Sequence, residues 1–214
     1  MAMTSGDSPS AAARAHGAEG RRIGEVVLAE SARFTVHCYD LHGAPPLGAF
    51  LRASNGHTPV YAVVAGASTV SIDAGRRPVA LGAEMESEEE VYRSQPQLAQ
   101  LFRTEAQALA VGFHDPSTEG PRHYLPPRPP RIHAFVYLCP PEEVRAFTQS
   151  LDFLALLANA PIPSADDVLA ACVREAAAAH DDRQAFLLRA GRETARLLGA
   201  DAQRLMAVLK RIRP

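Results

Sequence analysis

The residues best suited to chemistry lie in one short stretch, FTVHCYDLH, where His37, Cys38 and His42 fall within six positions. Imidazole nitrogens and thiolates are the ligands that zinc prefers. A thiol with an imidazole partner is also a common composition of nucleophilic sites. The stretch therefore raises two hypotheses, a metal site and a thiol enzyme. Both depend on how the backbone presents these three side chains.

The alternation of residues from Arg33 to Tyr39 predicts a β-strand for most of this stretch. Successive side chains of a strand point to opposite faces, so His37 and Cys38 cannot easily bind the same ion. Cys38 shares its face with Phe34 and Val36, which predicts a buried thiol that behaves as a small apolar side chain. A strand followed by a turn is therefore favoured over a metal site.

Other partners for such chemistry are remote in the sequence. A zinc ion needs three or four ligands, and the further candidates are His57 and His133. Cys139 with His133 is the one thiol–imidazole pair that we consider as a candidate for nucleophilic catalysis. Six positions apart on one strand, they would lie roughly 20 Å from each other. We therefore expect no catalytic residue, no metal and no cofactor, and we expect that the protein is not an enzyme.

Composition narrows the class of protein. The chain has 214 residues, 47% of them hydrophobic and 21% charged, which is typical of a folded globular domain. Its net charge of −2 predicts no global attraction to nucleic acid or to a membrane. The three cysteines are widely spaced and form neither a disulfide framework nor a CxxC motif. We expect a cytoplasmic protein with reduced thiols.

The chain carries no recognisable targeting or membrane segment. Residues 1–20 are rich in Ala, Ser and Gly and lack the apolar centre of a signal peptide, so a disordered arm is expected there. No apolar run approaches the roughly 18 residues that a membrane span requires.

The lysine content excludes one large class of enzyme. A Walker A loop needs Gly-Lys-Ser/Thr, because its lysine reaches the β- and γ-phosphates. The only lysine of this chain is Lys210, which stands between Leu209 and Arg211. The chain cannot be a conventional P-loop ATPase.

The hydrophobic pattern predicts an α+β fold with three parts. Residues 21–139 contain about six short strands, separated by turns and without βαβ alternation, which favours a small closed β-barrel. A helical insertion is expected at about 84–103, opened by Ser87 and the acidic run Glu88 to Glu90 as a capping box. Residues 140–214 have helical periodicity and predict a C-terminal helical tail, with one helix opening near Ser164 and another ending at Gly199.

Three segments could bind partners, and each has a plainer explanation. Arg76 and Arg77 could grip phosphate or nucleic acid, although paired arginines are common in exposed turns. The proline-rich run from Tyr124 to Arg131 could be a polyproline ligand, but it fits a stiff connector better. The last predicted helix, with its apolar stripe and flanking cations, could be a partner interface or could pack on its neighbours. Its candidate interface residues are Arg204, Leu205, Val208, Leu209, Lys210 and Arg211.

The N-terminal half resembles the HAS barrel, the small barrel found in HerA-type DNA-translocating ATPases and in ATP-synthase α and β subunits. The resemblance is carried by Gly24 to Val27 in the first strand, the aromatic second strand from Phe34, Leu47 and Gly48 before the third strand, and Val60 to Val64 in the fourth. It covers about residues 21–80 well and extends more loosely to Cys139. The whole chain also resembles stand-alone bacterial HAS-barrel proteins of unassigned activity.

The resemblance implies a barrel that helps assemble a hexamer and docks a NurA-type nuclease in the processing of DNA ends. It implies no catalytic residue, because the motor that follows the barrel in those ATPases is absent. We therefore expect a non-catalytic assembly or adaptor module with a HerA-type ATPase or NurA-type nuclease as partner and no membrane. The alternatives are direct binding of nucleic acid and, third, a metal or thiol enzyme built on His37, Cys38 and His42.

Overall fold

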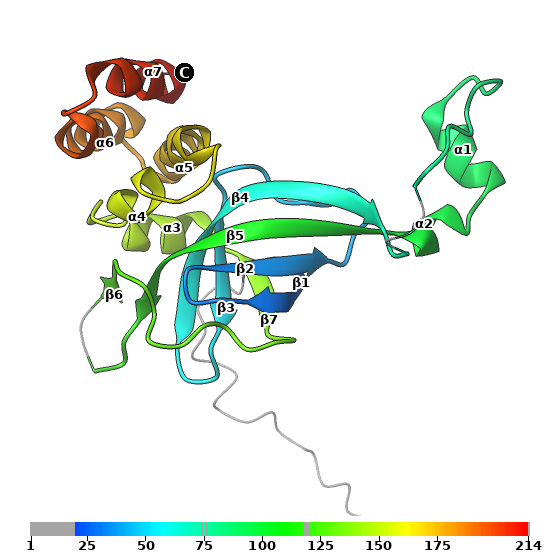
Figure 1. Ribbon diagram of the computed structural model, residues 1–214. Coiled ribbons are helices and arrows are strands. Elements are labelled where there is room, and N and C mark those ends of the chain that lie inside the picture. The colour runs from blue at the N-terminus through cyan, green and yellow to red at the C-terminus, as the bar shows by residue number, and fades with distance from the viewer. Residues whose placement is uncertain (1–19, 74, 76, 118–119, 214) are drawn as a thin grey trace, which may run out of the picture.

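A computed structural model describes residues 20–73, 75, 77–117 and 120–213 (Figure 1). The N-terminal arm expected over residues 1–20 lies, apart from Gly20, outside the described residues, and so does Arg76.

Six antiparallel strands form a closed barrel, as the sequence predicted. Their order around the barrel is β1-β7-β3-β4-β5-β2, and β2 pairs with both β5 and β1, which closes the ring. A two-residue strand, β6, pairs with the end of β5. The strands are β1 (Arg22–Ala29), β2 (Arg33–Cys38), β3 (Phe50–Ser54), β4 (Pro59–Ser71), β5 (Phe102–His114), β6 (Pro121–Arg122) and β7 (Phe135–Leu138).

The interior of the barrel is filled by small and medium apolar side chains. Alanines from β3, β4 and β5 are buried together with the larger Phe34 and Leu51, which suits the narrow interior of a six-stranded barrel. Cys38 lies in this core with Phe34 and Val36, on the face that the strand pattern predicted.

The C-terminal helices cover one half of the outer barrel wall. Side chains of β3, β4 and β5, including Phe50, Val63 and Val111, share a second core with the helices. Phe50 packs edge-on against Phe147 and Phe153. The helices are α3 (Pro141–Phe147), α4 (Leu154–Ala158), α5 (Ala165–Ala179), α6 (Arg183–Leu198) and α7 (Ala202–Ile212).

Helix α5 is the centre of this second core and lies directly on the barrel. Gly48, just before β3, has a φ of +84°, and a Cβ built on it would lie 2.4 Å from the backbone of Ala171 and Cys172. Only glycine permits both this backbone conformation and this approach. Gly48, which follows Leu47 in the motif named above, thus allows the barrel and α5 to pack in direct contact.

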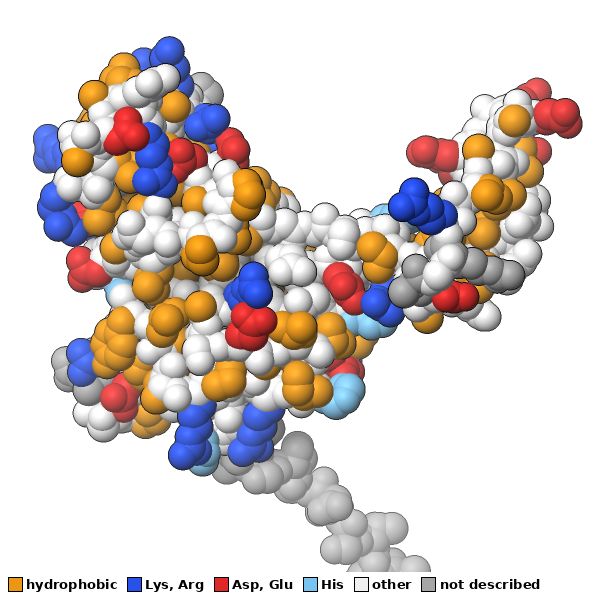
Figure 2. Space-filling view, in the orientation of Figure 1, with side chains coloured by type: hydrophobic (Ala, Val, Ile, Leu, Met, Phe, Trp, Pro, Cys, Tyr) orange, Lys and Arg blue, Asp and Glu red, His pale blue; other side chains and the backbone are white. Residues whose placement is uncertain are grey.

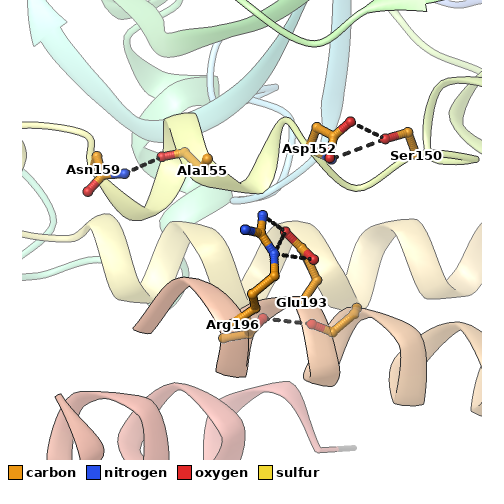
Figure 3. A network of polar contacts seen from close by, with 8 residues as sticks. Ser150, Asp152, Ala155, Asn159, Glu193 and Arg196 are labelled. Carbon is orange, nitrogen blue, oxygen red and sulfur yellow. Dashed lines mark hydrogen bonds and ion pairs between the residues drawn. The ribbon is translucent and has the colours of Figure 1, made fainter. Parts of the chain in front are cut away.

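Polar contacts fix the outer helices α6 and α7. Figure 3 shows Arg196 of α6 paired with Glu193, beside the segment that carries Asp152 and Asn159. Arg204 of α7 forms an ion pair with Asp166 at the start of α5, and its guanidinium also donates to the carbonyl of Ala158. The Arg204 pair thus ties α7 to α5, whereas the Arg196–Glu193 pair lies within α6. Helix α6 is tied to the segment after α3 by Arg189, whose guanidinium donates to the carbonyl of Thr148.

Strands β4 and β5 continue beyond the barrel as a two-stranded ribbon that carries a helical tip (Figure 1). The tip contains α1 (Glu88–Ser94) and α2 (Leu98–Leu101). Ser87 caps α1, as predicted, because its Oγ accepts from the N–H of Glu90. The second helix ends at Leu101 rather than near 103, because Phe102 already pairs with Ser71 in the ribbon. We call residues 72–101 the arm.

None of the helices in the described residues combines the length and the apolar character needed to span a membrane.

Candidate interaction surfaces

The His37–His42 stretch is divided between the two faces of β2 and the turn after it. Cys38 is 3% exposed inside the barrel, whereas His37 is exposed outside it. Among the residues that the structure describes, no three His, Cys, Asp or Glu side chains gather in a way that could hold a metal ion. This geometry favours the strand and turn over the metal site.

His42 instead connects the barrel to the arm. It adopts a left-handed conformation, with a φ of 65°, and its N–H donates to Thr104 Oγ1 at 2.8 Å. Its Nε2 lies 2.8 Å from the hydroxyl of Tyr92 in α1, and Thr69 Oγ1 lies 2.9 Å from Thr104 Oγ1 at the base of the ribbon. The structure thus groups His42 with hydroxyl groups, not with Cys38.

The three thiols are all buried. Burial raises the pKa of Cys38, and it raises those of Cys139 and Cys172 well above the usual range for a thiol. His133 does not approach Cys139, because its Nδ1 lies 3.0 Å from Glu25 Oε2 on the barrel surface. A thiolate nucleophile is therefore disfavoured at all three positions.

A half-buried polar cluster joins the barrel wall to α3. Glu143 Oε1 accepts from the hydroxyl of Tyr61 at 3.0 Å and lies 3.2 Å from Arg52 Nε, close enough for an ion pair but not aligned as a hydrogen bond. The guanidinium of Arg52 also lies 5.4 Å from the ring centre of Tyr137. Burial and the Glu143 charge raise the pKa of Tyr61 far above its usual range. This phenol stays neutral, so the cluster serves as an attachment between elements.

Within the described residues, no helix packs on the other half of the outer barrel wall. It exposes Tyr39 (50%), directly after β2, and Phe135 (45%) on β7. The guanidinium of Arg22 on β1 lies between their rings, 5.6 and 4.6 Å from the ring centres. Leu28 on β1 and Ile132, directly before His133, are also exposed. We call Arg22, Glu25, Tyr39, His133 and Phe135 the bare wall.

Hydrogen bonds hold the bare wall in place. Glu25 accepts from the Tyr39 hydroxyl at 2.9 Å and contacts His133 at 3.0 Å. The Tyr39 and His133 hydrogen bonds keep the pKa of Glu25 below its ordinary value, so the carboxylate is ionised. Tyr, Phe and Arg are residue types that are enriched in protein–protein interfaces. The bare wall therefore has the composition of a docking surface.

A second apolar surface lies on the arm. A groove of about 790 Å³ runs between the loop after β4 and helices α1 and α2. Val79 (74% exposed), Ile72, Tyr92 and Leu101 line it, and α1 has no buried residue. The arm thus exposes apolar side chains that the rest of the described chain does not cover.

Of the two predicted phosphate-binding arginines, the structure describes Arg77, which lies on this arm. Arg77 is exposed and lines the groove, while Arg76 lies outside the described residues. The groove is bordered by the acidic run that includes Glu88. Because Asp73 and Glu88 line the same groove as Arg77, their carboxylates disfavour a phosphate backbone at this place.

The proline-rich run packs across one end of the barrel. Pro126 and Pro130 are buried, the N–H of Arg131 donates to the carbonyl of Ser54, and the ring of Tyr124 contacts that of Phe113. These contacts favour the connector over a free polyproline ligand. The same end of the barrel gathers cations, because Arg128 lies 3.3 Å from His57 Nε2 and the Arg131 guanidinium sits over Gly56.

The candidate interface on the last helix is divided by the packing of α7. Val208 is fully buried against the other helices, and Leu205 and Leu209 are partly buried there. Arg204 and Arg211 form ion pairs with Asp166 and Asp167 of α5. Lys210 is exposed. Most of the apolar stripe therefore faces inward, and the outward side of α7 is the part open to a partner.

No family model matches this chain, and no curated protein matches it either.

Sequence reasoning did not single out the bare wall. The outward position of Tyr39 on the second strand was a signal, but an exposed aromatic residue on one strand is common. Phe135 and Arg22 lie far from Tyr39 in the sequence, and only the pairing of β1 with β2 and β7 brings the three together.

Proposed function

We propose that this protein is a non-catalytic assembly or adaptor module whose bare wall docks a partner protein. The carrying observation is that helices cover one half of the barrel wall, while the other half holds Arg22 between the exposed rings of Tyr39 and Phe135. Such preorganised aromatic and guanidinium groups lose little conformational entropy on binding.

The partner that we propose is a HerA-type ATPase or a NurA-type nuclease in the processing of DNA ends. Support comes from the resemblance of residues 21–80 to the HAS barrel, together with the closed six-stranded barrel of the fold. The burial of all three thiols is in keeping with a module that lacks its own chemistry.

A native pull-down from the source cell, with and without DNase, tests this function. We expect a HerA-type ATPase or NurA-type nuclease to remain bound after DNase treatment, and to be lost from the double variant Tyr39→Ser/Phe135→Ser. The matched control is Tyr124→Ser, because Tyr124 is an equally exposed aromatic residue outside the bare wall. Absence of both partner types from the wild-type sample would contradict the proposal.

Direct binding of nucleic acid is the second candidate function. The cations at the end of the barrel make that end a better site for nucleic acid than the arm. Arg128, His57 and Arg131 would contact phosphates there. Binding of a labelled oligonucleotide should then weaken steeply as salt rises, and Arg128→Ala should reduce the slope of that dependence by about one. Partners that disappear from the pull-down on DNase treatment would favour this candidate.

A further inference from the structure

Among the described residues of the arm only Leu98 is buried, so the arm has little of the packing that stabilises the rest of the protein. Helix α1 has seven residues and no buried side chain, whereas isolated helices of that length are unstable in water. Val79, Ile72, Tyr92 and Leu101 remain exposed around the groove. A contiguous apolar surface of this kind marks a site where another molecule packs.

The charge around the groove defines what can pack there. Five glutamates lie between positions 84 and 90, and none of them forms a salt bridge within the described residues. Three of the five, Glu88, Glu89 and Glu90, occupy the first turn of α1. The groove therefore fits a surface that combines cations with exposed apolar side chains.

This chain carries such a surface on the outer sides of α6 and α7. Leu188 (59%) and Met206 (54%) are exposed there. Arg192 and Lys210 are also exposed and have no ion-pair partner among the described residues. Gly191 faces Leu209 across the two helices, so the segments that carry Arg192 and Lys210 lie side by side.

The two surfaces lie at opposite ends of the molecule. Figure 1 shows the arm projecting away from the helical region, and Figure 2 shows acidic side chains at the end of the arm and Lys and Arg side chains around the helices. An arm therefore cannot reach the α6–α7 surface of its own chain. A second copy presents the same surface to it.

We propose that the arm groove of one copy docks on the outer face of α6 and α7 of a second copy, head to tail. The contact is heterologous, so each copy keeps one free arm and one free helical face until a ring closes or a filament grows. The proposal does not depend on the function of the bare wall, which stays open in this arrangement.

Sedimentation velocity of the full chain across protein and salt concentrations tests the proposal. We expect species larger than the monomer at low salt that dissociate as salt rises, because the contact is partly electrostatic. The variants E88K/E89K and R192E/K210E should each weaken self-association at least about tenfold. An equimolar mixture of the two variants should recover it, because each supplies the charge that the other has inverted.

Two controls separate this contact from other effects. Glu142→Lys changes the net charge in the same direction at an exposed position on α3 and should leave assembly intact. Replacement of residues 73–100 by Asn-Gly should abolish assembly without a charge reversal. The backbone allows this hairpin, because the N–H of Ile72 donates to the carbonyl of Leu101. A wild-type protein that stays monomeric at low salt, or a variant mixture that stays monomeric, would overturn the proposal.

Discussion

The arm and the C-terminal helical region are both helical, and both extend from the same barrel, yet they are stabilised in different ways. Helix α5 buries ten residues against the barrel and its neighbouring helices, whereas α1 buries none. The difference shows that helix-capping signals determine where a helix starts, while tertiary packing determines whether it is rigid.

Gly48→Ala should have the largest effect, because it separates the helical region from the barrel. A Cβ at this position has an unfavourable φ of +84° and overlaps the backbone of α5. We expect a loss of about 3 kcal/mol or more in the free energy of unfolding, measured by denaturant titration. Gly66→Ala is the control and should change stability by less than about 1 kcal/mol, because nothing lies within 4 Å of a Cβ there. Equal effects of the two substitutions would contradict the close contact with α5.

Glu143→Ala tests the second attachment of the helical region. It removes the carboxylate shared by Arg52 and Tyr61 and leaves two half-buried polar groups without this partner. We expect a loss of about 2–4 kcal/mol. Glu142→Ala, at the neighbouring exposed position, should be nearly neutral in the same denaturant titration. If Glu143→Ala left the free energy of unfolding unchanged, the cluster would contribute nothing to the attachment of α3 to the barrel.

Acid pH should weaken the packing of the helical region on the barrel. Burial lowers the pKa of His123, which contacts Phe147 and Phe153, and burial with the nearby Arg189 lowers that of His180. Because the unfolded chain binds these protons first, stability is complete above a pH of about 6.5 and falls as pH drops toward the lowered pKa values. Melting curves from pH 8 to pH 5 measure this slope.

The variant His180→Gln provides the matched test of that pH dependence. Thr148 Oγ1 already donates to the carbonyl of Val144, so His180 Nε2 must donate to Thr148, as a glutamine amide also can. The variant should unfold with a shallower dependence on pH. An unchanged slope would assign the acid sensitivity to other groups.

Ser87→Ala should have the smallest effect on global stability. It tests most directly whether the arm unfolds independently of the helical region. It removes the N-cap of α1, which is worth about 1 kcal/mol locally. Because Leu98 is the single buried side chain among the described residues of the arm, we expect unchanged global melting and faster hydrogen exchange confined to residues 88–94, measured at high salt and low protein concentration. Asp182→Ala removes the matching cap of α6 and should lower global melting instead. A global shift from Ser87→Ala would mean that the arm is part of the cooperative core.

Much of the fold could be predicted from the sequence, because it follows from local periodicity and capping. The burial of Cys38 beside Phe34 and Val36, the cap at Ser87 and the helix ending at Gly199 are confirmed. The predicted element boundaries were less accurate where a strand competes with a helix. The helix that was expected to end near 103 ends at Leu101, and Phe102 begins β5. The alternation from Arg33 to Tyr39 alone would leave Thr35 exposed opposite Phe34 and Val36, but Thr35 is 7% exposed, because exposure also depends on neighbouring elements.

The sequence by itself determined the strands, the helices and the exclusion of a P-loop, because these depend on residue types at short spacing. Only the tertiary structure decided which surfaces remain open. Packing turned the stripe of α7 inward, left the bare wall without a helix, and carried the arm away from the basic helices. Each outcome depends on contacts between residues far apart in the chain, and short-range pattern contains no information about them.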